Sequence, residues 1–404
     1  MVRNFIAEGP VTLISAGKAA EGMVRGFLLA ASENYIEGGV VVGPVASTSV
    51  EHPIMFHVGG HPLPDRGSLA AGRDALRCAT EMSPSGCLVV LLSGGASALL
   101  AVPFEGVTLG EKIDTTRVLL AAGLPIHEIN CVRKHLSAIK GGRLLSAAAG
   151  RVLTLALSDV VWPVEDDQAV IGSGPTVADR STFSEAVKIL DRPGVGALIP
   201  RPVIDLMERG RRGGLPETLK ESFRLASDSL YRVIGSRKQA MEGATAAARD
   251  LGYAVAVVES PVVGEARIVG DNHVGRVVEA SRGLNGSVCI VSSGESTVTV
   301  VGDGRGGRNQ EFALAAAPAI SRLDGLAVLA SVGTDGVDGP TDAAGALVDS
   351  TTVARSKLLG LAPGPTYLAG NDAYTYFDRL GDLVRTGPTG TNVGDLQVVL
   401  RSRS

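Results

Sequence analysis

The fold class is indicated by residues 87–100, CLVVLLSGGASALL. Their first six residues are apolar without interruption, which predicts a strand buried on both faces, as in a parallel sheet. A glycine turn and a short helix are expected to follow. The first amides of such a helix lack partners and favour an anion. This turn is either a cradle for a phosphate or a tight turn without a ligand, and the residues concerned are Ser93, Gly94, Gly95 and Ser97.

Two further segments repeat the pattern of an apolar strand followed by a polar turn. Residues 11–15 predict a strand that leads into a turn with Lys18 and then a helix. This turn is no P-loop, because Thr12 stands where that motif requires glycine. A lysine at a helix start opposes the helix dipole, so a functional role and a solvated surface lysine both stay open. Residues 151–157 predict another buried strand, and Asp159 follows it at the edge where open α/β sheets bind ligands.

Chain length favours two domains. The chain has 404 residues, more than most single domains contain. The basic, glycine-rich segment 209–220 is the candidate linker, and a strand over residues 223–226 is expected after it. We therefore predict two α/β domains, an N-terminal one over 1–215 and a C-terminal one over 216–404.

Charge and cysteine content narrow the function classes. A net charge of −4 without a basic stripe argues against nucleic acid as the main partner. The four cysteines are scattered, which is typical of free thiols in a reducing compartment. No apolar run approaches the roughly 20 residues that a membrane span needs. We expect a soluble, cytoplasmic protein without a membrane partner, and the oligomeric state stays open, a homo-oligomer included.

The C-terminal half contains a second glycine-rich stretch, residues 302–311, GDGRGGRNQE. We predict a strand over 297–301 before it and a helix after it, with Arg305 and Arg308 supplying positive charge for a phosphate or carboxylate. A polar, mobile loop is the alternative. The stretch also fits a dinucleotide fingerprint, but residues 288–291 predict a hairpin with the preceding strand, whereas the fingerprint requires a lone strand that opens a βαβ unit.

Basic residues gather in residues 130–143, NCVRKHLSAIKGGR, which we predict to be helical. On a helix Arg133, Ser137 and Lys140 share one face. Such a run is either a solvated face or a patch that faces a polyphosphate. The candidate phosphate ligands here are Asn130, Arg133, Lys134 and Lys140.

An acidic turn, residues 333–342, follows an apolar strand over 326–332. Carboxylate oxygens suit Mg²⁺, which makes Asp335 and Asp338 candidate metal ligands, with a solvated turn as the alternative. Anion cradles, a basic segment and acidic turns together favour phosphoryl transfer. The residues alone indicate a phosphotransferase or a binder of a phosphorylated or carboxylate metabolite.

Several of these segments, in this order, resemble the class II glycerate 2-kinase family. The resemblance covers nearly the whole chain through residues 60–65, 93–100, 130–143, 172–176, 302–311, 333–342 and 387–396. It implies an N-terminal Rossmann-like doubly wound domain, a smaller C-terminal α/β domain of the MOFRL type, and an active-site cleft between them. It also implies ATP- and Mg²⁺-dependent phosphorylation of D-glycerate to 2-phosphoglycerate. A kinase of another small hydroxy acid and an NAD(P)-dependent hydroxypyruvate reductase are the alternatives.

The resemblance assigns roles to individual residues. Lys18 and Arg308 match residues that act on the phosphates or on the glycerate carboxylate, and Asp159 or Asp335 is expected to hold Mg²⁺ or orient the attacking hydroxyl. Two departures concern the cradles, because Ser15 and Ala96 stand where the family has glycine. Further substrate or phosphate ligands are expected at Ser93, Gly94, Gly95, Ser97, Asn130, Arg133, Lys134, Lys140, Gly306, Gly307, Glu311 and Asn392.

Overall fold

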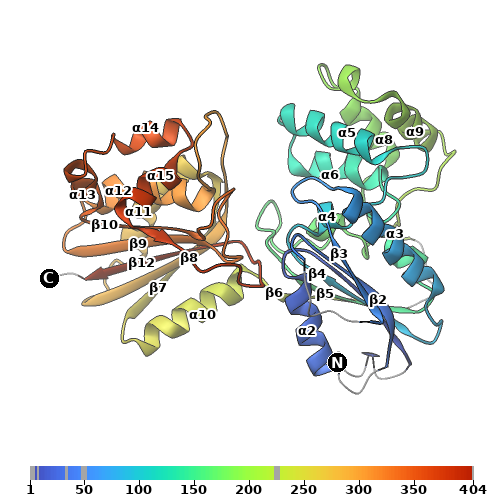
Figure 1. Cartoon of the computed structure of the whole chain (residues 1–404), viewed down its shortest axis with the longest axis horizontal. Helices are drawn as coiled ribbons and strands as arrows, with labels where there is room; N and C mark the ends of the chain where they lie inside the picture. Colours follow the sequence, from blue (N-terminus) through green and yellow to red (C-terminus); the bar gives the residue numbers. More distant parts are fainter. Residues whose placement is uncertain (1–4, 7–8, 32–34, 47–51, 223–227, 403–404) are drawn as a thin grey trace. The chain divides into compact units, whose positions relative to one another are not determined.

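The computed structural model describes residues 5–6, 9–31, 35–46, 52–222 and 228–402. The chain folds into two compact units, each an α/β structure around its own six-stranded sheet (Figure 1). One unit comprises residues 1–157 and 167–234, and the other comprises residues 158–166 and 235–404. The predicted α/β class is therefore confirmed. Among the described residues, no helix combines the length and apolar character needed to cross a membrane.

The first unit is built on a sheet with the strand order β3-β2-β1-β4-β5-β6, in which neighbouring strands run parallel. The chain proceeds from β1 to one edge of the sheet and then from β4 to the other. The carboxyl ends of β1 and β4 are thus a switch point, where doubly wound sheets bind ligands. The strands are β1 (Val11–Ala16), β2 (Ile36–Gly43), β3 (Ile54–Val58), β4 (Cys87–Leu92), β5 (Arg151–Leu157) and β6 (Ser229–Gly235).

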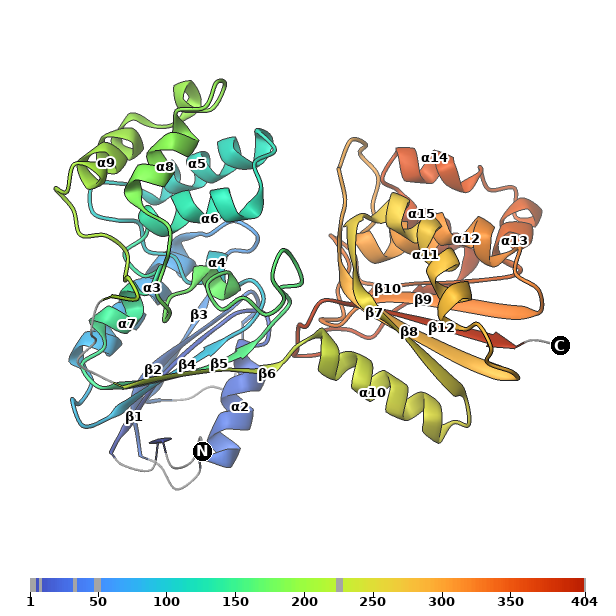
Figure 2. The same ribbon diagram turned by 180° about the vertical axis from the view of Figure 1, so that it is seen from behind.

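Helices cover this sheet and extend the unit beyond it. Helix α2 buries Val24 and Phe27 against Leu13 and Val89 of the sheet, while α5, α6, α8 and α9 pack into a separate apolar cluster around Phe183. Figure 2 shows this helical cluster beyond the carboxyl ends of the strands. The helices are α2 (Ala20–Ala30), α3 (Arg66–Glu81), α4 (Ala96–Leu99), α5 (Leu109–Ala121), α6 (Ile126–His135), α7 (Arg143–Ala147), α8 (Phe183–Leu190) and α9 (Arg201–Arg211), with 3₁₀ turns η1 (Ile171–Ser173) and η2 (Gly196–Leu198).

The second unit has a mixed sheet with the order β11-β10-β9-β12-β8-β7, antiparallel except for the parallel pair of β7 and β8. Helix α10 covers one face through Met241 and Ala248, and α11 and α12 cover the other. The strands are β7 (Ala254–Glu265), β8 (Ser287–Thr297), β9 (Leu326–Gly333), β10 (Gly345–Asp349), β11 (Leu383–Val384) and β12 (Asp395–Ser402). The helices are α10 (Arg237–Asp250), α11 (Ala266–Ala280), α12 (Arg308–Ile320), α13 (Thr352–Leu358), α14 (Gly364–Ala369) and α15 (Ala373–Leu380).

Three predictions about local structure were wrong. The predicted hairpin is absent, because residues 287–297 form a single strand, β8, whose Gly294 pairs with β12 and lies against β7. The strand predicted over 297–301 does not form, since residues 298–301 belong to no strand. The basic segment 130–143 is not one helix, because α6 ends at His135 and the next helix, α7, begins at Arg143. The candidate linker 209–220 packs into the first unit, because Glu217 and Lys220 bond there to α6 and to the segment before α8.

The structure does not test two other predictions, a strand and the domain boundaries. The strand predicted over residues 223–226 lies outside the described residues. The division into domains 1–215 and 216–404 stays a prediction, and the compact units of the structure divide at Ile234 and Gly235.

Candidate functional site

In the first unit, the turns after β1 and β4 are joined at the switch point. The Lys18 N–H donates to the carbonyl of Gly94 over 2.9 Å, and the Ala19 N–H donates to the Ser93 hydroxyl over 3.0 Å. Gly17 has a φ of +133°, and a Cβ there would lie 2.1 Å from the Ser93 Oγ. Only glycine permits this approach. The two turns predicted independently from sequence therefore form one structure.

The Ser93 side chain supports this structure from inside. It is 1% exposed, and its hydroxyl oxygen accepts from the backbone at the start of α2. Gly95 adopts the left-handed conformation, with φ +85°, and the His61 ring lies beside it. Ser93 thus positions the turn that carries Lys18, while phosphate binding by Ser93, Gly94 and Gly95 stays a prediction.

A second group of predicted ligands meets around Ser97 of α4. The Arg133 guanidinium donates to the Ser97 hydroxyl over 2.7 Å, and that hydroxyl lies 2.7 Å from the hydroxyl of Ser173. Asn130, on the same helix as Arg133, is 5% exposed. The structure brings Ser97 and Arg133 together as predicted.

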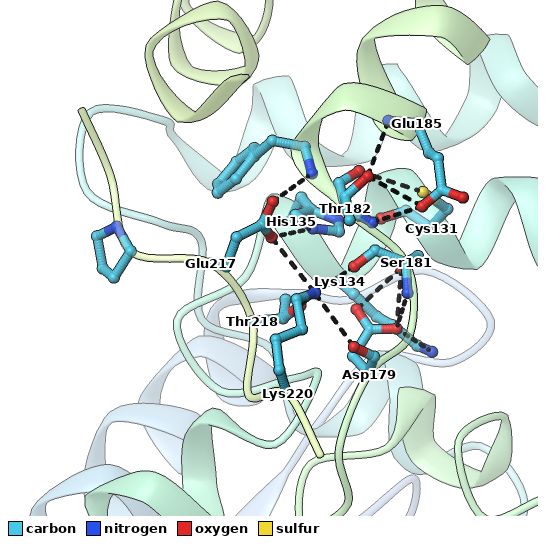
Figure 3. A network of polar contacts seen from close by, with 12 residues as sticks. Cys131, Lys134, His135, Asp179, Ser181, Thr182, Glu185, Glu217, Thr218 and Lys220 are labelled. Atoms are coloured by element: carbon cyan, nitrogen blue, oxygen red, sulfur yellow. Dashed lines mark hydrogen bonds and ion pairs between the residues drawn. The ribbon is translucent and has the colours of Figure 1, made fainter. Parts of the chain in front are cut away.

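Lys134 and Lys140 have roles within the fold. The Lys140 ammonium donates to the carbonyls of Ser97 and Leu100 at 2.8 and 3.2 Å, and the residue is 1% exposed. Burial and the nearby cationic side chains hold the pKa of Lys140 well below its usual range. Lys134 forms a buried ion pair with Asp179 at 3.2 Å (Figure 3). Lys134 and Lys140 are therefore bonded within the protein and do not form the predicted phosphate-facing patch. The phosphate roles of Arg133 and Asn130 stay predictions.

Replacing Lys140 with methionine is expected to lower the free energy of unfolding by about 3 kcal/mol, because buried carbonyls lose their donor. Chemical denaturation of the purified variant measures the loss. The matched control is Lys188→Met, since Lys188 is exposed on α8 and its replacement should change stability by no more than about 0.5 kcal/mol. Equal stability of the two variants would contradict the structural role of Lys140.

In the second unit, the glycine-rich stretch before α12 packs against other backbone segments. A Cβ at Gly302 would lie 2.4 Å from the Gly370 carbonyl oxygen, and a Cβ at Gly304 would lie 2.4 Å from the Asp372 Cβ. The Asn371 side-chain oxygen accepts from the N–H of Gly302 over 2.9 Å. These glycines thus permit a close approach of protein to protein. The expected cradle of glycines around a ligand is wrong for this part of the stretch.

The free amides at the start of α12 are also occupied. Asp338 accepts from the N–H of Asn309 at 3.0 Å and from the N–H of Gln310 at 2.9 Å, and a Cβ at Gly307 would lie 2.3 Å from its Cγ. Burial raises the pKa of Asp338 to about 6 against the effect of these hydrogen bonds. Asp338 is therefore an internal anion that caps α12.

Asp338 does not fit the role of a Mg²⁺ ligand that the sequence predicted for it together with Asp335. Both oxygens of Asp338 face backbone N–H groups, and an Asp335 oxygen accepts from the N–H of Val337 at 3.1 Å. Within the described parts of the chain, no three acidic, histidine or cysteine side chains gather in an arrangement that could hold a metal ion. Asp338 is therefore unavailable to an ion, and the metal role of Asp335 stays a prediction.

Arg308, the first residue of α12, lies between two carboxylates. Asp395 accepts from its Nε at 3.0 Å and its Nη2 at 2.9 Å, and Glu295 accepts from its Nη1 at 2.8 Å. Asn309 donates to the same Asp395 oxygen over 2.9 Å. Arg308 is thus oriented by its own unit, with its carboxylate partners on β8 and β12.

Two other predicted residues meet near this group. The Asn392 amide donates to Asp159 over 2.7 Å, and Asp159 acts electrostatically on Glu295. Glu311 is 1% exposed, and it accepts from Asn371 over 2.7 Å. Glu311 therefore fastens the glycine-rich stretch from inside, whereas Asp159 and Asn392 lie with the Arg308 group. Gly306 shows no approach closer than 3.3 Å for an added Cβ.

The sequence-based search missed Glu295 and Asp395. Asp395 stands within the quoted segment 387–396, but its partner Arg308 is 87 positions away. Glu295 lies on β8 beyond the apolar run 288–291, so the continuation of that strand past Gly294 was the available signal. The incorrect hairpin concealed that signal, because it placed Glu295 just past a turn.

Comparisons with known proteins cover the whole chain. A family model described as "Domain of unknown function (DUF4147)" matches residues 3–208, and the "MOFRL family" model matches residues 288–395. A "Glycerate 2-kinase" of Pyrococcus horikoshii is 37% identical over 98% of this chain and 89% of its own length. A "Putative hydroxypyruvate reductase" of Agrobacterium vitis is 38% identical over 97% of this chain and 87% of its own length. A crystal structure of glycerate kinase from Thermotoga maritima superposes with a TM-score of 0.83 at 36% identity, covering 97% of this chain and 91% of that one.

Proposed function

Because this chain belongs to the glycerate 2-kinase family, we propose that it phosphorylates D-glycerate at the 2-hydroxyl with ATP. In this reaction the bond between the γ-phosphorus and the bridging oxygen breaks, a bond to the glycerate oxygen forms, and the hydroxyl proton is released. The products are 2-phosphoglycerate and ADP. The single observation that carries the proposal is similarity to a glycerate 2-kinase over 98% of this chain.

The proposal assigns electrostatic roles to Lys18 and Arg308. Phosphoryl transfer requires cations beside the transferring group and little covalent chemistry from the protein. Lys18 is supported by the joined turns at the switch point, and Arg308 is oriented by Asp395. These contacts favour a fixed position for each of the two residues. Asp159 is the proposed acceptor of the hydroxyl proton.

We propose that ATP binds together with Mg²⁺. In kinases this ion is held largely by phosphate oxygens and waters, with few protein carboxylates. The metal role of Asp335 thus stays a prediction. A cytoplasmic location and a homo-oligomeric state likewise stay predictions of the sequence.

Oxidoreductase activity is the less favoured alternative, although one relative is called a putative hydroxypyruvate reductase. A dinucleotide fingerprint requires glycines that admit a pyrophosphate to a helix start. Here Gly302 and Gly304 are packed against residues 370–372, and Gly307 is packed against Asp338. The space that a pyrophosphate would need at this turn is filled by protein. A kinase of another small hydroxy acid stays the closer alternative.

The test is an ATP-coupled assay of the purified protein with D-glycerate. We expect ADP release that depends on D-glycerate, and a phosphorus NMR spectrum that places the new phosphate on the 2-hydroxyl. Tartrate and related hydroxy acids serve as competing substrates. Faster turnover on one of them would reassign the substrate, and NADH oxidation by hydroxypyruvate without ADP release would overturn the proposal.

A further inference from the structure

Arg308 is shared by two carboxylates that differ in how firmly they are held. Asp395 is 0% exposed, and it receives two hydrogen bonds from Arg308 and one from Asn309. Among the described residues the Glu295 carboxylate has a single hydrogen bond, from Nη1 of Arg308, and 35% of its side chain is exposed. Asp395 is therefore the fixed anchor, and Glu295 is the partner that a ligand can replace.

Glu295 is also electrostatically disfavoured in its ionised form. Partial burial, only partly offset by the attraction of Arg308, raises the pKa of Glu295 to about 7, and repulsion by Asp159 and Asp395 adds to the rise. These three are the charged groups that face it, from α12, the segment 158–166 and β12. The single positive charge of Arg308 thus cannot balance the negative charges of Glu295, Asp159 and Asp395 together.

We propose that Glu295 occupies, in the free enzyme, the Arg308 position of a ligand oxyanion, and that binding of this oxyanion displaces Glu295 and protonates it. The ligand, a carboxylate or a phosphoryl group, takes the place on Nη1, while Asp395 keeps the guanidinium in place. This inference rests on the proposed function for the identity of the ligand. A bound anion removes the attraction of Arg308 and adds a like charge, and both effects favour the protonated carboxyl.

If binding takes up a proton, ligand affinity must fall as the pH rises. Ligand affinity is expected to weaken above pH 7, by up to about tenfold per pH unit, because the displaced Glu295 must bind a proton. At pH 7.5 a group with a pKa of about 7 is mostly ionised. Complete protonation on binding would then take up about 0.8 proton per site.

The experiment is isothermal titration calorimetry of the full-length enzyme in two buffers that differ in ionisation enthalpy. One arm uses D-glycerate and the other a non-hydrolysable ATP analogue, so that carboxylate and phosphoryl ligands are distinguished. Wild type should take up protons in one arm, and Glu295→Gln should bind without uptake and about tenfold more tightly at pH 8. Glu279→Gln, on the exposed side of α11 with 66% of its side chain accessible, is the control and should match wild type.

A stability measurement provides a second test without ligand. The pKa of Glu295 is higher in the folded state than its ordinary value of 4.5, so the folded state binds more protons between pH 4.5 and 7. Wild type should lose stability as pH rises through this window. Glu295→Gln should therefore have a higher Tm than wild type at pH 8, and the difference should shrink toward pH 5.

The outcomes separate the inference from the proposed function. Turnover with D-glycerate together with pH-independent binding would leave the proposed function standing and overturn the inference. Proton uptake that persists in Glu295→Gln would also overturn it, because the proton would then bind elsewhere. Absence of both turnover and binding would refute the proposed function, and the inference with it.

Discussion

Replacing Lys18 with methionine is expected to lower kcat for D-glycerate phosphorylation by about 10²–10³-fold, because one cation beside the transferring phosphoryl group is lost. The fold should persist. One contact of this residue with the β4 turn is the hydrogen bond from its backbone N–H to the Gly94 carbonyl, which the substitution leaves in place. An ATP-coupled assay at saturating D-glycerate measures kcat, and thermal unfolding checks the fold.

A lysine on the same unit supplies the matched control for this experiment. Lys188→Met removes an equal charge from an exposed position on α8 and should leave kcat at the wild-type value. A Lys18→Met enzyme that turns over as fast as Lys188→Met would remove Lys18 from the catalytic assignment. A Lys18→Met enzyme with a raised KM and an unchanged kcat would indicate that Lys18 stabilises the bound substrate and the transition state equally.

Apolar continuity made the first sheet predictable. Residues 87–92 and 151–157 were predicted as strands and are β4 and β5 without a shift. A strand covered on both faces is apolar at nearly every position, and runs of six or seven residues are shorter than most helices, which favours a strand. The order of the strands came from the structure, which joins the turns with Lys18 and Ser93 at the switch point.

Close packing explains where this approach failed in the second unit. Ser292, Ser293 and Gly294 have the composition of a turn, yet they continue β8. A Cβ at Gly294 would lie 2.0 Å from the Val262 carbonyl oxygen, so this glycine serves the close approach of β7 within a sheet. Local composition does not distinguish that use of glycine from a turn, because the neighbouring strand comes from elsewhere in the chain.

Charged residues were misassigned for a related reason. Lys134 and Asp179 are 45 positions apart, and the carbonyls around Lys140 come from residues about 40 positions away. A basic run is therefore identical in sequence whether its cations face water, a phosphate or a buried partner. The sequence indicated that Arg308 matters, while its carboxylate partners required the three-dimensional structure.

Arg308→Met is the variant with the second large expected effect, and it should reduce both activity and stability. Loss of the cation should lower kcat/KM by about 10²-fold or more. The free energy of unfolding should fall by about 3 kcal/mol, because Asp395 is left as a buried charge without its ion-pair partner. Coupled assay and chemical denaturation at pH 7.5 measure the two quantities on the same preparation.

The double variant Arg308→Met with Asp395→Asn separates these two effects. Neutralising Asp395 removes the unpaired buried charge, so stability should return to within about 1 kcal/mol of wild type. Activity should stay low, since no cation has been restored. Recovery of stability without activity would show that the ion pair holds the fold while the guanidinium serves the reaction. Recovery of both would mean that Arg308 contributes only through the fold, and the electrostatic role proposed for it would be wrong.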